Sequence, residues 1–463
     1  SDGGVLSLVG VKNYATASPP SSDAALRYYG PKTTSASLTA ALCFSAAYRQ
    51  FSKINNPDIQ TYASTLQSAA IAAWDWAIAN PSTSYYNSGI IAAGEQEISG
   101  YTLDMRKLIA AVHLYAATGD VQYLDYVELN YSNSHLIQWN FVYPFENLVQ
   151  LGLVYFASLP QVDALIAEDI RNTFVISMDT DSGNIPAFDN DVDPYYAYLS
   201  DANYTWGSNK TKTDMGNLYR AYHNYMYDPL INDELEEYSG TYLHYIHGVN
   251  PNGICFMSNM GGNGAEKSCN TIYHSWFTDG SAAWDDVLES TYGPAPGFIP
   301  GGVNPTWSLD DCCNTTCGAS DPDCILLSPP SSQPIEKSYR DWNTGWPQNS
   351  WEVTEPAIYS QASYLALLAS QVNQYSNDTS DQYSIEILDK DLYFSTFPKS
   401  IILQSPSGLK YSISVTNDGE IELNLVSSIA ASTSKSINAG VAIKSAGQGL
   451  IIKSMDLSLW KIN

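Results

Sequence analysis

The sequence predicts a mainly helical domain followed by a small β domain. Apolar residues recur at helical spacing in most of residues 1–372, and strand-like alternation is scarce there. After residue 383 the pattern changes, and apolar residues occupy alternate positions. The stretch 373–383 between the two patterns is polar and predicts a linker. We therefore expect one domain over 1–372 and a second over 384–463.

Ten segments of the first domain have helical periodicity or an apolar helical composition. Loops rich in Gly, Pro, Asn and Asp separate them, notably at 176–211 and 249–350, and loops of this length usually carry function. Helices are expected at 33–52, 57–79, 97–117, 120–128, 145–157, 160–173, 212–227, 232–246, 281–289 and 355–372.

The second domain is expected to consist of strands. Segments 401–413 and 419–425 alternate, and Asn417-Asp418-Gly419 is a hairpin turn signal. Segment 450–462 resembles 401–413, which suggests a weak repeat. We expect a β-sandwich-like accessory domain, and the sequence leaves its role open between carbohydrate binding and surface attachment.

The segment 346–359 carries the strongest chemical signal. It holds Glu352 and Glu355 among Trp346, Trp351 and Tyr359, just before an apolar helix. A carboxyl group beside aromatic rings suits sugar chemistry, because aromatic faces stack on sugar rings and apolar surroundings raise a carboxyl pKa. The alternative is that both glutamates are first-turn helix residues that favour the helix dipole.

Several segments together indicate a family. Residues 354–362 read Thr-Glu-Pro-Ala-Ile-Tyr-Ser-Gln-Ala, and five other segments precede them in order, at 30–42, 116–124, 204–209, 247–253 and 292–304. From about Gly3 to Val372 the chain resembles the family 9 glycoside hydrolases. This resemblance implies an (α/α)6 toroid, inverting cleavage of a cellulose-like β-1,4-glucan and no required cofactor. It makes Glu355, and not Glu352, the general acid.

The same resemblance implies an aspartate pair in a D-A-x-D-Y-like motif, one member of which activates water. Residues 1–9 already resemble the segment that follows this motif, and no substitute occurs later. We therefore expect a toroid without its first helices, whose catalytic base comes from a companion N-terminal polypeptide segment. The alternative is a non-catalytic carbohydrate-binding or cell-surface assembly protein derived from such an enzyme.

The resemblance also suggests which residues contact substrate. Family members often have P-H-H-R in the segment aligned with 270–280, where this chain keeps His274 but has no Arg. A single histidine is more often structural, and Trp206 and Asn209 could instead cap a helix. The expected substrate-binding residues are His274, Trp276, Tyr273, Trp206, Asn209, Tyr359 and Trp351.

Composition restricts the class of partner. The net charge is −27, from 48 acidic and 21 basic residues, so nucleic acids and anionic membranes are poor partners. No apolar stretch is long enough to predict a membrane span. The 34 tyrosines and 11 tryptophans suit a neutral polysaccharide, although many will lie in the core. Few basic residues and many Ser, Thr and Asn residues are typical of a secreted or cell-surface bacterial protein.

The seven cysteines fall into three groups. Cys255 and Cys269 bracket a glycine-rich loop and could pair, and Cys43 is expected to be free and buried in an apolar helix. The remaining four lie within 13 residues and could form two disulfides or ligate zinc. The secreted character favours disulfides. These four are Cys312, Cys313, Cys317 and Cys324.

Asp189, Asp191 and Asp193 are weak candidates for a structural calcium site. Alternating carboxylates suit Ca²⁺, but the EF-hand spacing is absent, so a solvated acidic loop is the alternative. Family 9 proteins often hold structural calcium, so the resemblance makes a calcium site here worth testing. The sequence shows no phosphate-binding loop, dinucleotide fingerprint or Ser-His-Asp arrangement.

Overall fold

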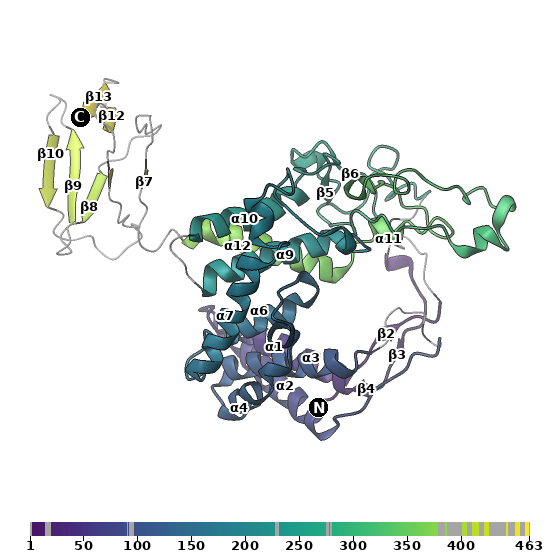
Figure 1. The fold of residues 1–463 in the computed structure, drawn as a ribbon, viewed down its shortest axis with the longest axis horizontal. Helices are drawn as coiled ribbons and strands as arrows, with labels where there is room; N and C mark the ends of the chain where they lie inside the picture. Colours follow the sequence, from purple (N-terminus) through teal and green to yellow (C-terminus); the bar gives the residue numbers. More distant parts are fainter. Residues whose placement is uncertain are drawn as a thin grey trace. The chain divides into compact units, whose positions relative to one another are not determined.

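A computed structural model describes residues 2–13, 20–89, 91, 97–226, 231–274, 277 and 280–377, and beyond them only the backbone of seven short strands. The chain divides into two compact units, Ser1–Leu368 and Ala369–Asn463. Almost all of the helices lie in the first unit (Figure 1). No helix of the described part of the chain is long and apolar enough to cross a membrane.

Nine helices of ten or more residues form the body of the first unit within its described residues. They are α1 (Thr34–Phe51), α2 (Pro57–Ala79), α3 (Gly100–Thr118), α4 (Val121–Asn130), α6 (Asn147–Phe156), α7 (Ala164–Thr180), α9 (Ser208–Tyr225), α10 (Asn232–Ile246) and α12 (Ile358–Asn377). Three shorter helices are α5 (His135–Trp139), α8 (Ile185–Asp189) and α11 (Trp351–Thr354).

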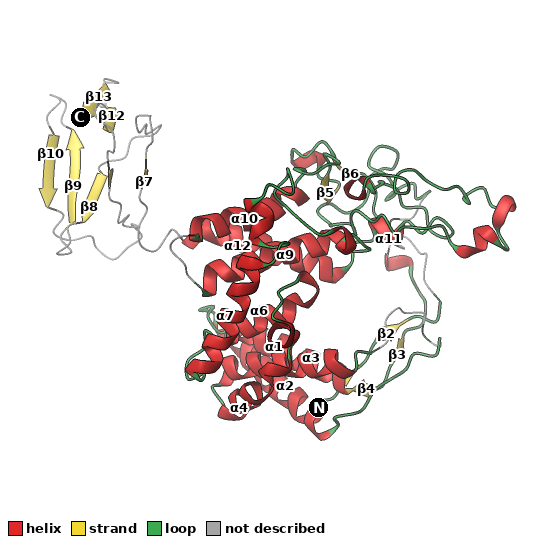
Figure 2. Cartoon of the chain, in the orientation of Figure 1, coloured by secondary structure: helices red, strands yellow, loops and turns green. Residues whose placement is uncertain are grey.

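Three two-stranded sheets accompany these helices. The chain between α10 and α11 runs mostly as loop (Figure 2). Two antiparallel pairs are β1 (Val5–Leu6) with β4 (Lys32–Thr33) and β2 (Val9–Gly10) with β3 (Tyr28–Tyr29), and the parallel pair is β5 (Cys255–Ser258) with β6 (Ser268–Cys269).

Local sequence signals set several helix ends. Thr33 and Asn56 precede α1 and α2, and their side-chain oxygens accept backbone N–H groups of the first turn. Pro57 begins α2, at a position where an N–H would have no helical partner. Gly119 ends α3 with a φ of 72°, and Asp120 then caps α4. The Gly-Asp pair therefore makes the tight turn between these two helices.

The long helices form two layers. Helices α1, α3, α6 and α9 contact one another in succession, while α2, α4, α7 and α10 each pack on one of them. Hydrogen bonds connect equivalent levels of neighbouring helices, so α1, α3, α6, α9 and α12 run parallel and begin at one end of the unit. We call these five helices the central row. The bonds join Arg106 to Thr39, Tyr101 to Glu146, Asn147 to Asp214 and Ser363 to Asp214.

Two glycines allow close packing within the central row. A Cβ atom on Gly152 of α6 would lie 2.7 Å from Ile109 Cδ1 on α3, and one on Gly216 of α9 would lie 2.8 Å from Leu367 Cδ2 on α12. Both separations are shorter than van der Waals contact, so any larger residue would push the helices apart.

A buried lysine connects α9 to the loop that precedes it. Lys212 is fully buried, donates a hydrogen bond to the carbonyl of Ala197, and lies 4.3 Å from the ring centroid of Tyr245. Burial lowers its pKa to about 8, whereas Asp193 and Glu336 favour the charged form. Asp193 also accepts the backbone N–H of Ala197 at 3.1 Å. The Lys212 ammonium and the Asp193 carboxylate both bind the backbone of Ala197, and together they hold this loop on the core.

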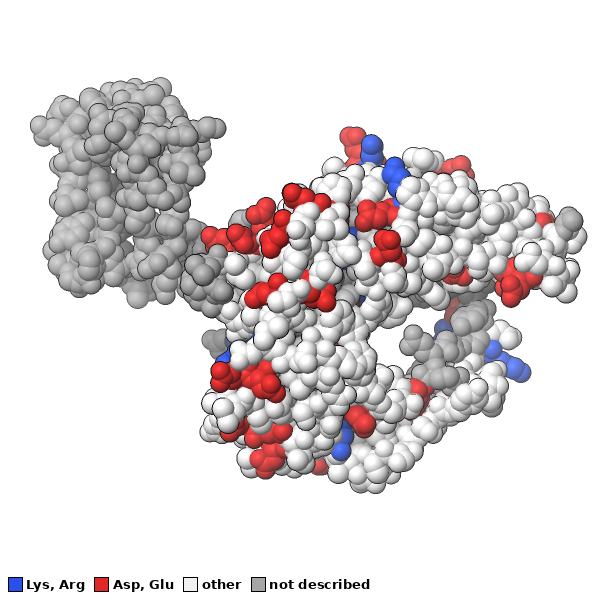
Figure 3. Space-filling model, viewed as in Figure 1, with Lys and Arg blue, Asp and Glu red and all other residues white. Residues whose placement is uncertain are grey.

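The predicted helices form with one exception. Helices α2 and α10 have the expected bounds, and the mainly helical fold is confirmed. The helix expected at 281–289 is wrong, because the carbonyls of Ala282 and Ala283 accept the N–H groups of Thr291 and Tyr292 and close a loop. The acidic composition is visible on the surface, since the face in Figure 3 carries many more acidic than basic side chains.

The second unit contains strands where alternation predicts them. Strands β8 (Ile401–Gln404), β9 (Lys410–Val415) and β10 (Ile421–Leu425) form an antiparallel sheet in the order β10-β9-β8, with Val415 opposite Ile421 around the expected turn. The other pairs are β12 (Leu450–Lys453) with β13 (Leu459–Ile462), antiparallel, and β7 (Ile385–Glu386) with β11 (Val441–Ala442), parallel. Helix α12 continues to Asn377, inside the stretch expected to be a linker.

The cysteines depart from expectation at three positions. Cys255 and Cys269 are free buried thiols, so the expected pairing is wrong. The register places Cys255 opposite Ser268, and the Cys269 sulfur lies 3.2 Å from the Tyr339 hydroxyl. Cys43 is free but exposed, because it lies on a side of α1 that the described residues leave uncovered. The four clustered cysteines form two disulfides, Cys312–Cys317 and Cys313–Cys324.

Replacing Lys212 with Met should lower the free energy of unfolding by about 1–3 kcal/mol, because the Ala197 carbonyl would lose its buried hydrogen-bond donor and Asp193 would lose a nearby cation. The measurement is the urea midpoint of the unfolding transition followed by tryptophan fluorescence. The matched control is Lys32→Met, which removes an exposed ion pair with Asp2 at 2.6 Å and should change the free energy by about 0–1 kcal/mol. Equal effects of the two substitutions would contradict the structural role of Lys212.

Candidate active site

Glu355 occupies the turn between α11 and α12. Its backbone is extended, with φ −70° and ψ 127°, because Pro356 disfavours a helical conformation in the residue before it. The turn therefore ends α11 and places Glu355 at the end of the unit where the central row begins. The side chain is half-buried, and this burial raises the pKa of its carboxyl group.

Two loops are hydrogen-bonded to the residues just before Glu355. The N–H of Tyr273 donates to the Thr354 carbonyl at 3.1 Å, and the N–H of Gly302 donates to the Val353 carbonyl at 2.8 Å. The ring of Tyr273 also lies 5.4 Å from that of Trp351, centroid to centroid. The structure thus brings Tyr273 and Trp351 beside the segment that ends in Glu355.

Trp206 approaches the same segment through Gly301. A Cβ atom on Gly301 would lie 3.0 Å from the Val353 carbonyl oxygen and 3.5 Å from Trp206 Cδ1, so Gly301 lies between them. The indole is 49% exposed and remains available to a ligand. Asn209 is fully buried instead, and its side chain donates to the Pro300 carbonyl at 3.1 Å. Its expected role in substrate binding is therefore corrected to a structural role in holding this loop.

The other residues expected to contact substrate lie in different surroundings. His274 directly follows Tyr273 and is partly buried, which lowers the pKa of its imidazole. Tyr359 is half-exposed on the first turn of α12. Trp276 lies outside the described residues. The structure therefore gathers Glu355 and Tyr273 with two tryptophans from separate segments, and it places His274 and Tyr359 next to them in the chain.

A partly buried aspartate orders the loop that carries His274. Asp341 accepts the N–H of Asn270 at 2.6 Å, and both the N–H and the hydroxyl of Thr271, at 3.2 and 3.0 Å. Desolvation raises the pKa of Asp341, and these hydrogen bonds oppose the rise. Sequence reasoning missed this residue, because an isolated aspartate carries no spacing signal.

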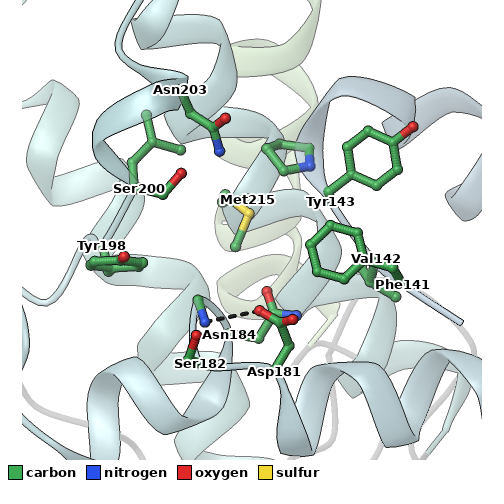
Figure 4. Close-up of a pocket in the computed structure, with 13 residues that line it drawn as sticks. Phe141, Val142, Tyr143, Asp181, Ser182, Asn184, Tyr198, Ser200, Asn203 and Met215 are labelled. Atoms are coloured by element: carbon green, nitrogen blue, oxygen red, sulfur yellow. Dashed lines mark hydrogen bonds between the residues drawn. The ribbon is translucent and has the colours of Figure 1, made fainter. Parts of the chain in front are cut away.

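A second feature is a cavity of about 130 Å³ beside the start of α6 (Figure 4). It combines aromatic faces with short polar side chains, a mixture that suits sugar hydroxyls and rings. The N–H of Gly183 donates to the Asp181 carboxylate at 2.9 Å in its wall. None of the expected site residues lines the cavity. Its lining is Phe141, Val142, Tyr143, Pro144, Asp181, Ser182, Gly183, Asn184, Tyr198, Leu199, Ser200, Asn203 and Met215.

The segment just before the cavity-lining residues 141–144 takes part in an aromatic stack. The His135 ring lies between those of Tyr101 and Trp139, with centroid separations of 3.7 and 3.4 Å. Its Nδ1 atom is 2.6 Å from Glu146 Oε1, and Trp139 is exposed. The dense aromatic run at 139–145 was the available sequence signal for this region, and sequence reasoning did not use it.

The calcium hypothesis is not supported by the described residues. Asp191 accepts the Tyr196 hydroxyl at 2.6 Å, and Asp193 turns inward to the backbone and Lys212. Asp189, Asp191 and Asp193 therefore do not converge on one point. Among the described residues, the one group of three or more potential ligands is the cysteine cluster.

Comparison with known proteins gives a consistent result. Residues 3–368 match glycosyl hydrolase family 9. Similar solved structures include a mutant thermostable endoglucanase from Alicyclobacillus acidocaldarius (18% identity, TM-score 0.59), a Bacteroides ovatus GH9 protein (21%, 0.59) and a metagenome-derived glycoside hydrolase family 9 endoglucanase (20%, 0.59). No curated protein matches the chain.

The solved structures share the fold over most of this chain. Each comparison covers 80% of the chain but only 61%, 59% and 58% of the three solved proteins, in the order given. The chain thus spans about three fifths of their length. The likeness confirms the helical (α/α) architecture of the first unit, with five helices of the central row and four outer helices in the described part.

Glu355→Gln should raise the melting temperature near pH 7, because it removes a half-buried carboxylate whose pKa is raised in the folded protein. The raised pKa means that Glu355 favours folding most at low pH, and that this contribution is lost as the pH rises through the folded pKa. The gain in melting temperature from Glu355→Gln should therefore disappear at about pH 4, where the carboxyl group of Glu355 is neutral. Melting curves at both pH values check this, and an equal gain at both would contradict it.

Proposed function

The chain belongs to glycosyl hydrolase family 9, and we propose that it supplies the acid and much of the sugar-binding surface of a hydrolase that cleaves β-1,4-glucan with inversion. The observation that supports this most is the half-buried carboxyl group of Glu355 next to the Trp351–Tyr273 ring pair. A carboxyl group with a raised pKa retains its proton at a pH where an exposed glutamate has lost it.

In the proposed reaction Glu355 donates its proton to the glycosidic oxygen as the bond to the leaving sugar breaks. Inversion requires a second carboxylate about 6.5–9.5 Å away, which takes a proton from the attacking water on the opposite face of the sugar ring. We assign this base to an aspartate of a companion N-terminal polypeptide segment. Trp206 and Tyr273 would stack on neighbouring sugar rings and hold the glucan in register.

Exposed apolar residues near strands β2 and β3 support a companion segment. Val9 is 56% exposed, Leu26 76% and Tyr29 65%, and the free thiol of Cys43 on α1 is also exposed. The space-filling view shows a hollow in the first unit (Figure 3), in the region where Figure 1 labels β2 and β3. Val9 and Tyr29 are partners in the β2–β3 pair, and exposed apolar surface formed by neighbouring side chains often binds another polypeptide. A partner that covers it could also carry the missing base.

Charge and cysteine chemistry support a neutral substrate and an extracellular location. A net charge of −27 repels anionic polymers and leaves an uncharged glucan as a compatible substrate. Two disulfides in one short loop form and persist in oxidising surroundings. We therefore propose a secreted or cell-surface protein, of bacterial type by composition.

The test uses natively purified material, with every polypeptide identified by peptide mapping, and measures glucan hydrolysis and the anomer released. Glu355→Gln should lower kcat by about 10²–10⁴-fold, because the leaving oxygen loses its proton donor. An aryl glycoside with a good leaving group should restore much of the rate, since it needs little protonation. Glu352→Gln is the matched control and should retain most of the activity.

Two results would contradict the proposal. An equal loss with Glu352→Gln, or no rescue by the activated substrate, would remove Glu355 from the role of acid. Native material that binds glucan and never cleaves it would instead identify a non-catalytic carbohydrate-binding or surface-assembly protein.

A further inference from the structure

We propose that the four cysteines of the disulfide loop form a zinc site when their disulfides are reduced. All four sulfur atoms lie within 4.8 Å of one another. The Cys317 sulfur lies 3.6 Å from that of Cys324 and 4.0 Å from that of Cys313, although it is bonded to neither. Tetrahedral zinc with Zn–S distances of about 2.3 Å separates its sulfur ligands by about 3.8 Å. These two separations, between sulfurs that are not bonded to each other, are close to that value, and the two bonded pairs need only separate on reduction to share one metal ion.

The backbone of the loop brings the cysteines together independently of the sulfur bonds. Short-range hydrogen bonds fold residues 310–324 into two consecutive turns. None of these bonds involves a sulfur atom, so we expect them to keep the four thiols within reach of one ion after reduction. The bonds run from Cys312 N–H to the Asp310 carboxylate (2.9 Å), Cys313 N–H to the Asp310 carbonyl (3.0 Å), Cys317 N–H to the Cys312 carbonyl (2.9 Å), Asp321 N–H to the Cys317 carbonyl (3.0 Å) and Cys324 N–H to the Asp321 carbonyl (3.2 Å).

The surroundings of the loop favour access and a cation. All four cysteines are partly exposed, so a reductant and a metal ion can both reach the sulfurs. The segment 308–330 contains no Lys or Arg, and Asp310, Asp311, Asp321 and Asp323 give it a negative potential. Free thiols here therefore have no cation of the same segment to pair with, and a divalent ion supplies one.

The redox step balances with a dithiol as reductant. Each of two dithiol molecules transfers two electrons and two protons to one disulfide and becomes a disulfide itself. The four resulting thiols bind one Zn²⁺ as thiolates and release four protons, so binding strengthens as the pH rises. The loop would then be held by covalent bonds in an oxidising compartment and by a metal ion in a reducing one.

The test uses the full chain, reduced anaerobically with a dithiol that is then removed, with Co²⁺ as the spectroscopic probe. We expect one Co²⁺ per chain, with the intense visible absorption of tetrahedral cobalt thiolate, and its loss on addition of one equivalent of Zn²⁺. The oxidised chain should show no such absorption. The double substitution Cys317→Ser and Cys324→Ser should abolish it, while Cys43→Ser, the matched control, should retain it.

A measurement on the unmodified chain guards against variants that do not fold. Zn²⁺ should slow alkylation of the four loop cysteines in the reduced protein and leave exposed Cys43 reactive, as shown by peptide mapping. Four new thiols without cobalt absorption would overturn the proposal. Equal alkylation rates with and without Zn²⁺, or absorption that persists in the double variant, would also overturn it.

Discussion

The buried carboxylate of Asp214 connects three helices on which the candidate site depends. It accepts hydrogen bonds from Asn147 at the start of α6 and from Ser363 on α12, and it pairs with Lys210 one turn earlier on α9. A buried carboxylate needs such partners, because an unpaired charge in the interior is strongly unfavourable. The hydrogen bonds and the ion pair of Asp214 therefore fix the relative height of α6, α9 and α12. They also fix the level at which the N-terminal ends of these helices meet.

Glu355 follows from that alignment. It precedes α12 by a short turn, so a helix held at the level of Ser363 also fixes the position of Glu355. Gln361 extends the same arrangement, since its side chain accepts the N–H of Ile299 and donates to the Ile299 carbonyl. This exchange attaches the loop that contains Gly301 to α12. The helices supply the frame, and backbone hydrogen bonds to that frame position loops with little regular structure of their own.

Sequence reasoning succeeded where the signal is local. Periodicity predicted α2 and α10 with the bounds that the structure has. It failed where distant segments decide the outcome. Asn209 resembles a binding residue in its motif but is buried under a loop some ninety residues further along the chain. The thiol of Cys269 faces Tyr339, a contact that no spacing predicts.

Pro356 has a consequence for binding as well as for chain direction. Its ring restricts the backbone of Glu355 to extended conformations even in the unfolded chain. Glu355 therefore has little backbone freedom left to lose when a ligand arrives, and the entropic penalty of ordering it falls on folding rather than on recognition. A site built in this way gains affinity by limiting what must still be ordered, independently of how many contacts a ligand makes with the aromatic rings around it.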